Sequence, residues 1–211
     1  MVDGQVRVND VTNAALIAAM LEIPREKFVP DARVSLAYID EDLCVREAEG
    51  GKPARYLMEP MVLAKLIQAL AIVPSDRVLD IGCATGYSPA VLSLLAQSVV
   101  ALEEDASLLK SAQKALGSRH NVKVANGPLA AGWAAGAPYD AILLEGAVER
   151  VPEALLGQLR DGGRLAAVIR KDSAAKAALF TRSGENISAR RLFDAAVPPL
   201  PGFEMPESFV F

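Results

Sequence analysis

Five short apolar runs, separated by segments with helical spacing, constrain the fold of this chain more than any other feature. Each run is nearly continuous in Val, Leu, Ile and Ala, which is typical of strands buried on both faces of a parallel sheet. In the segments between them apolar residues recur every three or four positions, the period of a helix that packs on a sheet. We therefore expect an α/β fold with a doubly wound, mostly parallel sheet. The predicted strands are 77–81, 98–103, 121–125, 139–145 and 164–169, and the predicted helices between them are 87–96, 105–116 and 151–160, the last ended by the Gly-rich turn 161–163.

Two further helices are predicted before the first strand. Residues 10–21 have apolar side chains at helical spacing, and Asn9 or Asp10 offers an N-cap oxygen. Residues 59–72 resume the same period with Pro60 in the first turn, where its missing N–H leaves no hydrogen bond unmade. We therefore expect an N-terminal helical and irregular region in front of the sheet.

Beyond the last predicted parallel strand the pattern changes to two strand-like runs about Gly184 and Glu185, which predict an antiparallel hairpin at the sheet edge. The prolines of "PPLPGFEMPESFVF" forbid regular structure there, so we expect an extended strap that packs on the domain. A chain of 211 residues has the length of one large α/β domain. We expect a single domain with an N-terminal region at 1–72, a central core at 73–173 and C-terminal edge strands and tail at 174–211.

Composition and charge exclude several classes of function. The net charge is −4 and the chain has no block of Lys and Arg, so nucleic acid is not an expected partner. Lys65 and Gln68 interrupt the longest apolar run and no secretory pattern opens the chain, so we expect a cytoplasmic protein without a membrane span. Cys44 and Cys83 lie far apart and His120 is the one histidine, which favours reduced packing cysteines and argues against a metal site or a His-based triad.

The stretch "RVLDIGCATGYSPAVLSLL" runs from a strand through a Gly-containing loop into a helix, the arrangement of a nucleotide cradle. A P-loop needs a Lys that this loop lacks, and a dinucleotide would bring its pyrophosphate towards the Asp80 carboxylate. S-adenosylmethionine carries an ammonium and a sulfonium and no phosphate, so Asp80 would attract it. Glu103 ends the next strand, where an acid can accept hydrogen bonds from a ribose diol. The alternative is that Gly82 and Gly86 only form a tight turn and Glu103 is a solvated strand end.

Through this loop and several other stretches, the sequence resembles the protein-L-isoaspartate O-methyltransferase family within the Rossmann-like methyltransferases. The similar stretches include "AAMLEIPREKFVP", "EPMVLAKLIQAL", "ALEED" and "NVKVANG", and the most specific one is "APYDAILLEGAVERVPEALLGQLRDGGRL". The resemblance covers most of the chain and becomes loose from about Ala174. It implies methyl transfer from S-adenosylmethionine to the carboxylate of an isoaspartyl residue in a damaged protein, with the substrate region at 1–72. An ionised carboxylate is itself a nucleophile, so the reaction does not require a His or Cys base.

The chain departs from the family at the substrate element. Where the family has Gln-Thr-Ile-Ser-Gln-Pro, this chain has "RYLMEP", so Tyr56 replaces Thr and Met58 replaces the Ser hydroxyl. Tyr56 could supply a phenol hydroxyl to a carboxylate, or Arg55 could bind a carboxylate through two guanidinium N–H groups. Tyr56 and Met58 could equally be packing residues. The candidate catalytic positions are therefore Met58, Tyr56 and Arg55.

The chain also departs at the cofactor residues. The Asp of the family's Gly-Asp-Gly is Pro128, which leaves Asn126 or a backbone carbonyl to receive the adenine, and the middle glycine of the loop is Ala84. Glu145 adds an acid near the pocket mouth that would repel an anionic substrate, unless it is a solvated strand end. The resemblance implies cofactor contacts from Asp80, Gly82, Cys83, Ala84, Gly86, Glu103, Glu104, Asn126, Gly127, Pro128 and Glu145, with Cys83 and Ala84 acting through backbone N–H groups.

Three functions remain open at this point. The first is methylation of an isoaspartyl carboxylate in a protein or peptide substrate. The second is a divergent family member that binds S-adenosylmethionine and serves as a ligand-sensing or interaction module. The third is methylation of another acceptor, for which Glu145 would act as a base. The sequence gives no indication of the oligomeric state.

Overall fold

A seven-stranded sheet forms the centre of the molecule, as the computed structural model shows for residues 1–171 and 174–204. Its strand order is β5-β4-β3-β6-β7-β8-β9, and the neighbours from β5 to β7 are parallel. The last two strands are antiparallel, so the expected doubly wound, mostly parallel sheet is confirmed. The strands are β3 (Arg77–Ile81), β4 (Ser98–Glu103), β5 (Val122–Asn126), β6 (Tyr139–Val148), β7 (Leu159–Lys171), β8 (Ala174–Ser183) and β9 (Asn186–Asp194).

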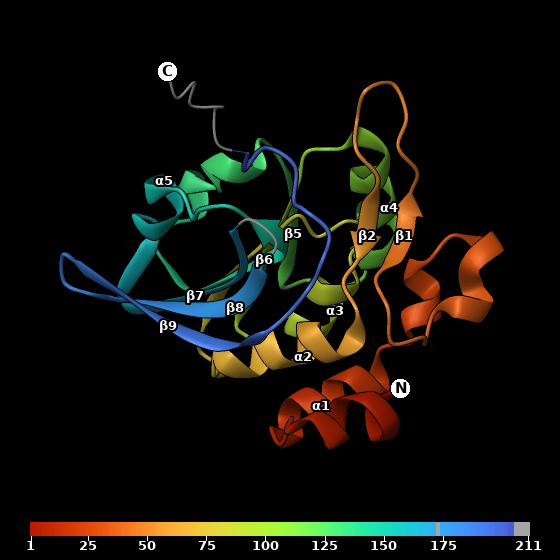
Figure 1. Cartoon of the computed structure of the whole chain (residues 1–211), viewed down its shortest axis with the longest axis horizontal. Coiled ribbons are helices and arrows are strands. Elements are labelled where there is room, and N and C mark those ends of the chain that lie inside the picture. The colour runs from red at the N-terminus through yellow and green to blue at the C-terminus, as the bar shows by residue number, and fades with distance from the viewer. Residues whose placement is uncertain (172–173, 205–211) are drawn as a thin grey trace.

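Helices cover both faces of this sheet, and the alternation of side chains along each strand separates two apolar clusters. In β3 the Val78 side chain packs into one cluster and Leu79 into the other, which is the period of two that a strand imposes. The larger cluster contains residues of four helices, and the smaller one contains Leu155 of the fifth. Figure 1 shows α1 and α2 below the sheet and α4 beside its β5 end. The helices are α1 (Ala14–Glu22), α2 (Pro60–Ala69), α3 (Tyr87–Leu92), α4 (Ala106–Leu116) and α5 (Glu153–Leu156).

The N-terminal region is helical and irregular, as expected, but its first cap is not the predicted one. The Asn13 side chain accepts a hydrogen bond from the Leu16 N–H and begins α1, whereas Asp10 lies outside the helix at φ +64°. Neither Asn9 nor Asp10 is the N-cap, because residues 11–13 are not helical and carry the chain to the helix start. Before α2 the chain also forms a small separate sheet from β1 (Leu43–Arg46) and β2 (Arg55–Leu57), which are antiparallel.

Three predicted helices end before the periodicity indicated. The helices expected over 59–72 and 87–96 end at Ala69 and Leu92, and the helix expected over 151–160 is the single turn of α5. The prediction that residues 161–163 end a helix is wrong, because these residues lie inside β7. The Tyr139 N–H donates to the Gln158 carbonyl, and Leu159 pairs with Tyr139, so contact with β6 extends β7 backwards over the segment that looked helical.

The C-terminal hairpin is confirmed, and it turns at Gly184 between β8 and β9. Figure 1 shows this hairpin reaching beyond the other strands at one end of the sheet. The chain then returns as an extended segment, residues 195–203, which we call the strap. The Ala147 N–H donates to the Pro198 carbonyl and the Leu200 N–H donates to the Ala147 carbonyl, so the strap lies along the end of β6. The tail from residue 205 lies outside the described residues.

The strand order reverses between β3 and β6, and the carboxyl ends of these strands are where an open α/β sheet binds its ligand. Asp80 lies one residue before the end of β3, and Glu145 lies near the end of β6. The fold therefore brings the predicted loop to the expected edge of the sheet. Among the described residues, none of the helices has the length and apolar character that crossing a membrane requires.

Candidate active site

The loop that follows β3 turns through three residues with positive φ. Gly82 and Gly86 have φ of +80° and +98°, which glycine adopts without a steric penalty. Ala84 has φ of +48°, a left-handed conformation that costs an L-residue energy. The cost of an alanine at this position lies in the backbone, because Ala84 adopts a conformation that glycine adopts more readily.

Asp80 forms the acidic floor of the site together with Glu145. The Asp80 side chain is fully buried, its Oδ2 accepts a hydrogen bond of 2.8 Å from Ser88 Oγ, and its Oδ1 has no partner among the described residues. Burial, together with the smaller effect of the Glu103 charge, raises the pKa of Asp80 to about 7. Burial, and next the Asp80 charge, raise the pKa of Glu145 well above its ordinary value. Glu145 is therefore not the solvated strand end that the sequence left open.

Glu103 lies at the end of β4 and is completely buried, so it is not a solvated strand end either. Its Oε1 accepts hydrogen bonds from Arg55 Nη1 at 2.8 Å and from the backbone N–H groups of Glu104 and Asp105 at 3.0 Å. Its Oε2 accepts from Arg55 Nη2 at 2.8 Å and from the Ala84 N–H at 2.9 Å. The acid that was expected to receive a ribose diol is thus held by a bidentate arginine of this chain.

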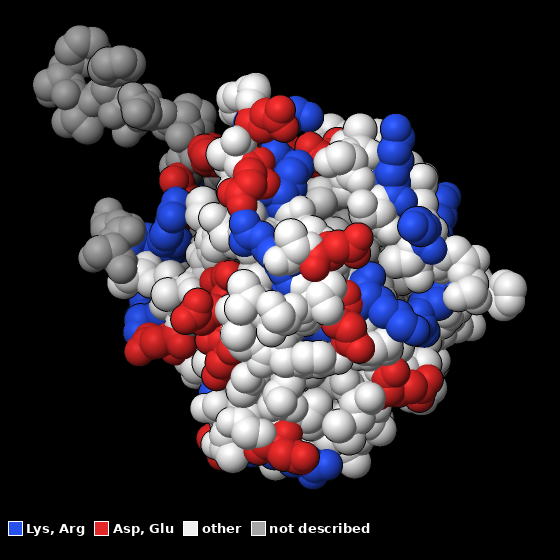
Figure 2. Space-filling view, turned by 90° about the vertical axis from the view of Figure 1, so that its right-hand side faces the viewer, with Lys and Arg blue, Asp and Glu red and all other residues white. Residues whose placement is uncertain are grey.

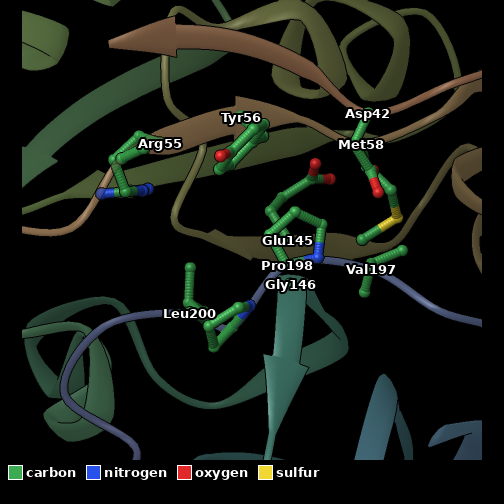
Figure 3. A pocket seen from close by; sticks show the side chains of 11 residues that line it. Asp42, Arg55, Tyr56, Met58, Glu145, Gly146, Val197, Pro198 and Leu200 are labelled. Carbon is green, nitrogen blue, oxygen red and sulfur yellow. The ribbon is translucent and has the colours of Figure 1, made fainter. Parts of the chain in front are cut away.

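The strap closes the other side of the loop. A Cβ placed on Gly82 would lie 2.6 Å from Leu200 Cδ1 and 3.4 Å from Arg55 Nη2, so both side chains lie directly against the loop. Arg55 Nη2 also donates to the Gly82 carbonyl at 3.2 Å. The cavity between β2, the end of β6 and the strap has a volume of about 10 Å³, roughly one water molecule. Figure 3 shows Leu200 and Pro198 of the strap below Arg55, Tyr56 and Glu145.

The candidate substrate positions line this small cavity together with Glu145 and Asp42. Tyr56 is half-buried, and Met58 is 3% exposed with its side chain next to Glu145 and Val197 (Figure 3). These residues therefore pack and also border the cavity, and a role for Tyr56 or Arg55 towards a carboxylate stays a prediction. Asp42 was not found from the sequence; burial raises its pKa to about 6. The cavity mouth is thus lined by two carboxyl groups.

Arg25 is a second residue that sequence reasoning missed. Its side chain is 1% exposed, donates to the carbonyls of Ala37 and Met58 at 2.9 and 2.8 Å, and lies 4.7 Å from the centre of the Tyr87 ring. It therefore fixes the substrate segment around Met58 against the helix that follows the Gly loop. Its neighbours in the sequence, Pro24 on one side and the charged Glu26 and Lys27 on the other, gave no signal that it is buried.

The remaining predicted cofactor residues follow β4 and β5. The Asn126 amide donates to the Glu103 carbonyl at 3.1 Å, and Glu104 is exposed beside it. Pro128 is also exposed, and a Cβ on Gly127 would lie 3.7 Å from the Trp133 ring. Cys83 is buried and free, with its thiol pKa raised by burial. The fold thus brings every predicted cofactor residue to the carboxyl ends of β3, β4, β5 and β6.

The largest hollow described on the molecule lies elsewhere. It has a volume of about 750 Å³ and lies between the segment 23–31, β1 and α4, and none of the predicted site residues lines it. Figure 2 shows the side of the molecule that carries α4 and β1, where acidic and basic side chains are interspersed. This face has no continuous basic stripe of the kind that binds nucleic-acid phosphates.

Comparison with known proteins gives the family. The model of the family described as protein-L-isoaspartate(D-aspartate) O-methyltransferase matches residues 3–200. The chain belongs to the protein-L-isoaspartate O-methyltransferase family. It is 34% identical to protein-L-isoaspartate O-methyltransferase 2 of Shewanella sediminis over 99% of this chain and 84% of that protein. It is 39% identical to the protein-L-isoaspartate O-methyltransferase of Methylorubrum extorquens over 78% of this chain and 70% of that protein.

Solved structures agree with this family. A structure named protein-L-isoaspartate O-methyltransferase has a TM-score of 0.82 and 25% identity, and the match covers 96% of this chain and 66% of that chain. A Plasmodium falciparum structure in complex with S-adenosyl-L-homocysteine has a TM-score of 0.75 at 20% identity, covering 92% and 94% of the two chains, which shows the common fold. The protein is therefore an enzyme of a family of S-adenosylmethionine-dependent methyltransferases.

The residue types of the site suit this cofactor. The unpartnered Asp80 Oδ1 matches a cationic ligand, and the glycines allow close approach to the backbone. In the conformation described here, Arg55 holds the Glu103 carboxylate and Leu200 lies against Gly82. Both side chains have to move before a nucleoside can contact Glu103 and Gly82.

Proposed function

We propose that the protein methylates the carboxylate of isoaspartyl residues in proteins, with S-adenosylmethionine as its methyl donor. The observation that carries the proposal is the family match over residues 3–200, together with Asp80, the Gly loop and Glu103 at the point where the strand order reverses. The expected substrate is a protein or peptide, and the expected location is the cytoplasm. The cofactor residues are those predicted from the sequence, from Asp80 to Glu145.

The substrate side of the site is proposed to position its acceptor rather than to remove a proton from it. An ionised carboxylate already carries the electron pair that attacks the methyl group, so alignment and exclusion of water are the main requirements. Met58 supplies apolar surface, and Tyr56 supplies a phenol at the cavity mouth. Arg25 fixes their segment through the Met58 carbonyl. These roles do not need the Ser hydroxyl that the family carries at position 58.

Binding and turnover test the proposal separately. Calorimetric titration with S-adenosylhomocysteine tests the cofactor, and Asp80→Asn is expected to weaken binding because it removes the acidic partner of the ligand's ammonium. Transfer of a labelled methyl group to an isoaspartyl peptide tests the reaction, with the same peptide containing ordinary aspartate as the control. Absence of heat with S-adenosylhomocysteine at millimolar concentration, together with absence of transfer, would refute the proposed activity.

A second candidate is a family member that binds the cofactor without isoaspartyl activity, and one observation favours it. Asp42 lines the cavity where an anionic acceptor would enter, and with a pKa of about 6 it is ionised at neutral pH and repels that acceptor. In that case S-adenosylhomocysteine binds while the isoaspartyl peptide is not labelled. Labelling of a different component in a cell extract would then identify another acceptor, and absence of any labelled component would favour a ligand-sensing or interaction module.

A further inference from the structure

Arg55 is the residue that most clearly separates this site from an open cofactor pocket. Its side chain is 4% exposed, and its two terminal nitrogens each lie 2.8 Å from a different oxygen of Glu103. Bidentate hydrogen bonds of this kind are the strongest contacts that an arginine forms with a carboxylate. The pair joins the small sheet of β1 and β2 to the end of β4.

Glu103 can be released from Arg55 without losing all of its partners. Three backbone N–H groups, those of Ala84, Glu104 and Asp105, also donate to its carboxylate. These donors come from the chain segments on either side and remain when the guanidinium moves. A hydroxyl-bearing ligand that takes the place of Arg55 therefore meets a carboxylate that is already oriented and charged.

Arg55 is also the one Lys or Arg among the residues that line the cavity at the strap. The other acidic or basic side chains of that lining are the carboxyl groups of Asp42 and Glu145. The guanidinium of Arg25 already donates hydrogen bonds to two backbone carbonyls, one of which belongs to Met58. An anionic acceptor that enters this cavity thus has one side chain of opposite charge to meet, and in the described conformation that side chain is bound to Glu103.

We propose that Arg55 competes with the cofactor for Glu103 and, once displaced, binds the carboxylate of the acceptor. The cofactor's diol takes over the Glu103 oxygens, Leu200 moves from Gly82 with the strap, and the freed guanidinium turns into the cavity between Tyr56 and Glu145. Arg55 is then a specificity-determining residue, because an anionic acceptor finds its counter-charge only after the cofactor has entered. The inference rests on the proposed function, since it assumes both the cofactor and an anionic acceptor.

The test compares the wild-type protein with Arg55→Gln, Arg55→Lys and the control Arg46→Gln. Arg46 lies 3.5 Å from Asp105, so it forms an ion pair close to the site but not with Glu103. Calorimetric titration with S-adenosylhomocysteine gives Kd, and methyl transfer to an isoaspartyl peptide at saturating cofactor gives KM and kcat. Thermal unfolding confirms that each variant is folded. Arg55→Lys keeps the positive charge but cannot bridge both Glu103 oxygens, so it carries the test if Arg55→Gln does not fold.

Arg55→Gln is expected to bind S-adenosylhomocysteine about tenfold more tightly than wild type, because the internal competitor is gone, and to raise the KM for the peptide by about tenfold or more. Arg55→Lys is expected to tighten cofactor binding with a smaller rise in KM, and Arg46→Gln to change neither. Wild-type binding as tight as that of both Arg55 variants would overturn the competition, and an unchanged peptide KM would overturn the acceptor role. Absence of binding in all four proteins would instead refute the proposed function itself.

Discussion

The stability of this protein is expected to fall as the pH rises from about 4 to about 7, and Asp80 is the reason. Burial raises the pKa of Asp80 from 3.8 to about 7, so over this interval the folded protein holds a proton that the unfolded chain has lost. Because the folded state binds more protons, the free energy of unfolding decreases with increasing pH. Glu145 acts in the same direction, since its pKa is also raised by burial and by the Asp80 charge.

The magnitude follows from the pKa difference. About three pH units at 1.36 kcal/mol per unit correspond to about 4 kcal/mol for Asp80 when it is fully ionised. Of this, between about 2 and 3 kcal/mol is lost between pH 5 and pH 7.5. No discount for solvent screening applies, because the Asp80 side chain is completely buried.

Urea unfolding of wild type and Asp80→Asn at pH 5 and pH 7.5 measures the effect. The Asn amide keeps an oxygen for the Ser88 hydroxyl but does not titrate, so the variant is expected to gain between about 2 and 3 kcal/mol relative to wild type as the pH rises. Glu145→Gln is expected to reduce the pH dependence without abolishing it, and Asp31→Asn on the surface serves as the control. Parallel curves for wild type and Asp80→Asn would refute the reasoning.

Three further substitutions test the local structure, each by urea unfolding at neutral pH. Asn13→Ala removes the side-chain cap of α1 and is expected to cost about 1 kcal/mol, and an unchanged stability would contradict the cap assignment. Arg25→Ala leaves two buried carbonyls without their donor and opens a cavity beside Tyr87, so a loss of at least about 3 kcal/mol is expected, whereas the exposed Arg7→Ala should cost less than about 0.5 kcal/mol. Ala84→Gly relieves a left-handed alanine and is expected to stabilise the fold by up to about 1 kcal/mol, and a clear loss of stability would show that the backbone is not strained there.

The order of strands and helices could be predicted because the hydrophobic pattern of each segment indicates its secondary structure without reference to distant residues. Parallel strands buried on both faces leave continuous apolar runs, so four of the five predicted strands begin within one residue of the observed position. The exception is β7, which starts at Leu159 because of pairing with Tyr139 on another strand. The α5 segment has helical periodicity, yet this long-range pairing overrides it.

The candidate site was predictable in its residue types and not in its contacts. Asp80, Gly82 and Glu103 stand at strand ends, and the topology of a parallel sheet alone brings them together. The contact between Arg55 and Glu103 joins residues 48 positions apart on two different sheets, and no sequence spacing signals it. The strap over Gly82 escaped prediction for the same reason, because its place depends on the end of β6.

The hairpin at the end of the sheet has a consequence for how the molecule behaves at high concentration. Strand β9 is last in the strand order, and most of its residues are exposed, so its outer backbone groups are available to another chain. Arg190 and Arg191 lie in the middle of this strand. Two copies that paired through this edge would bring like charges together, which opposes the first step of fibril growth.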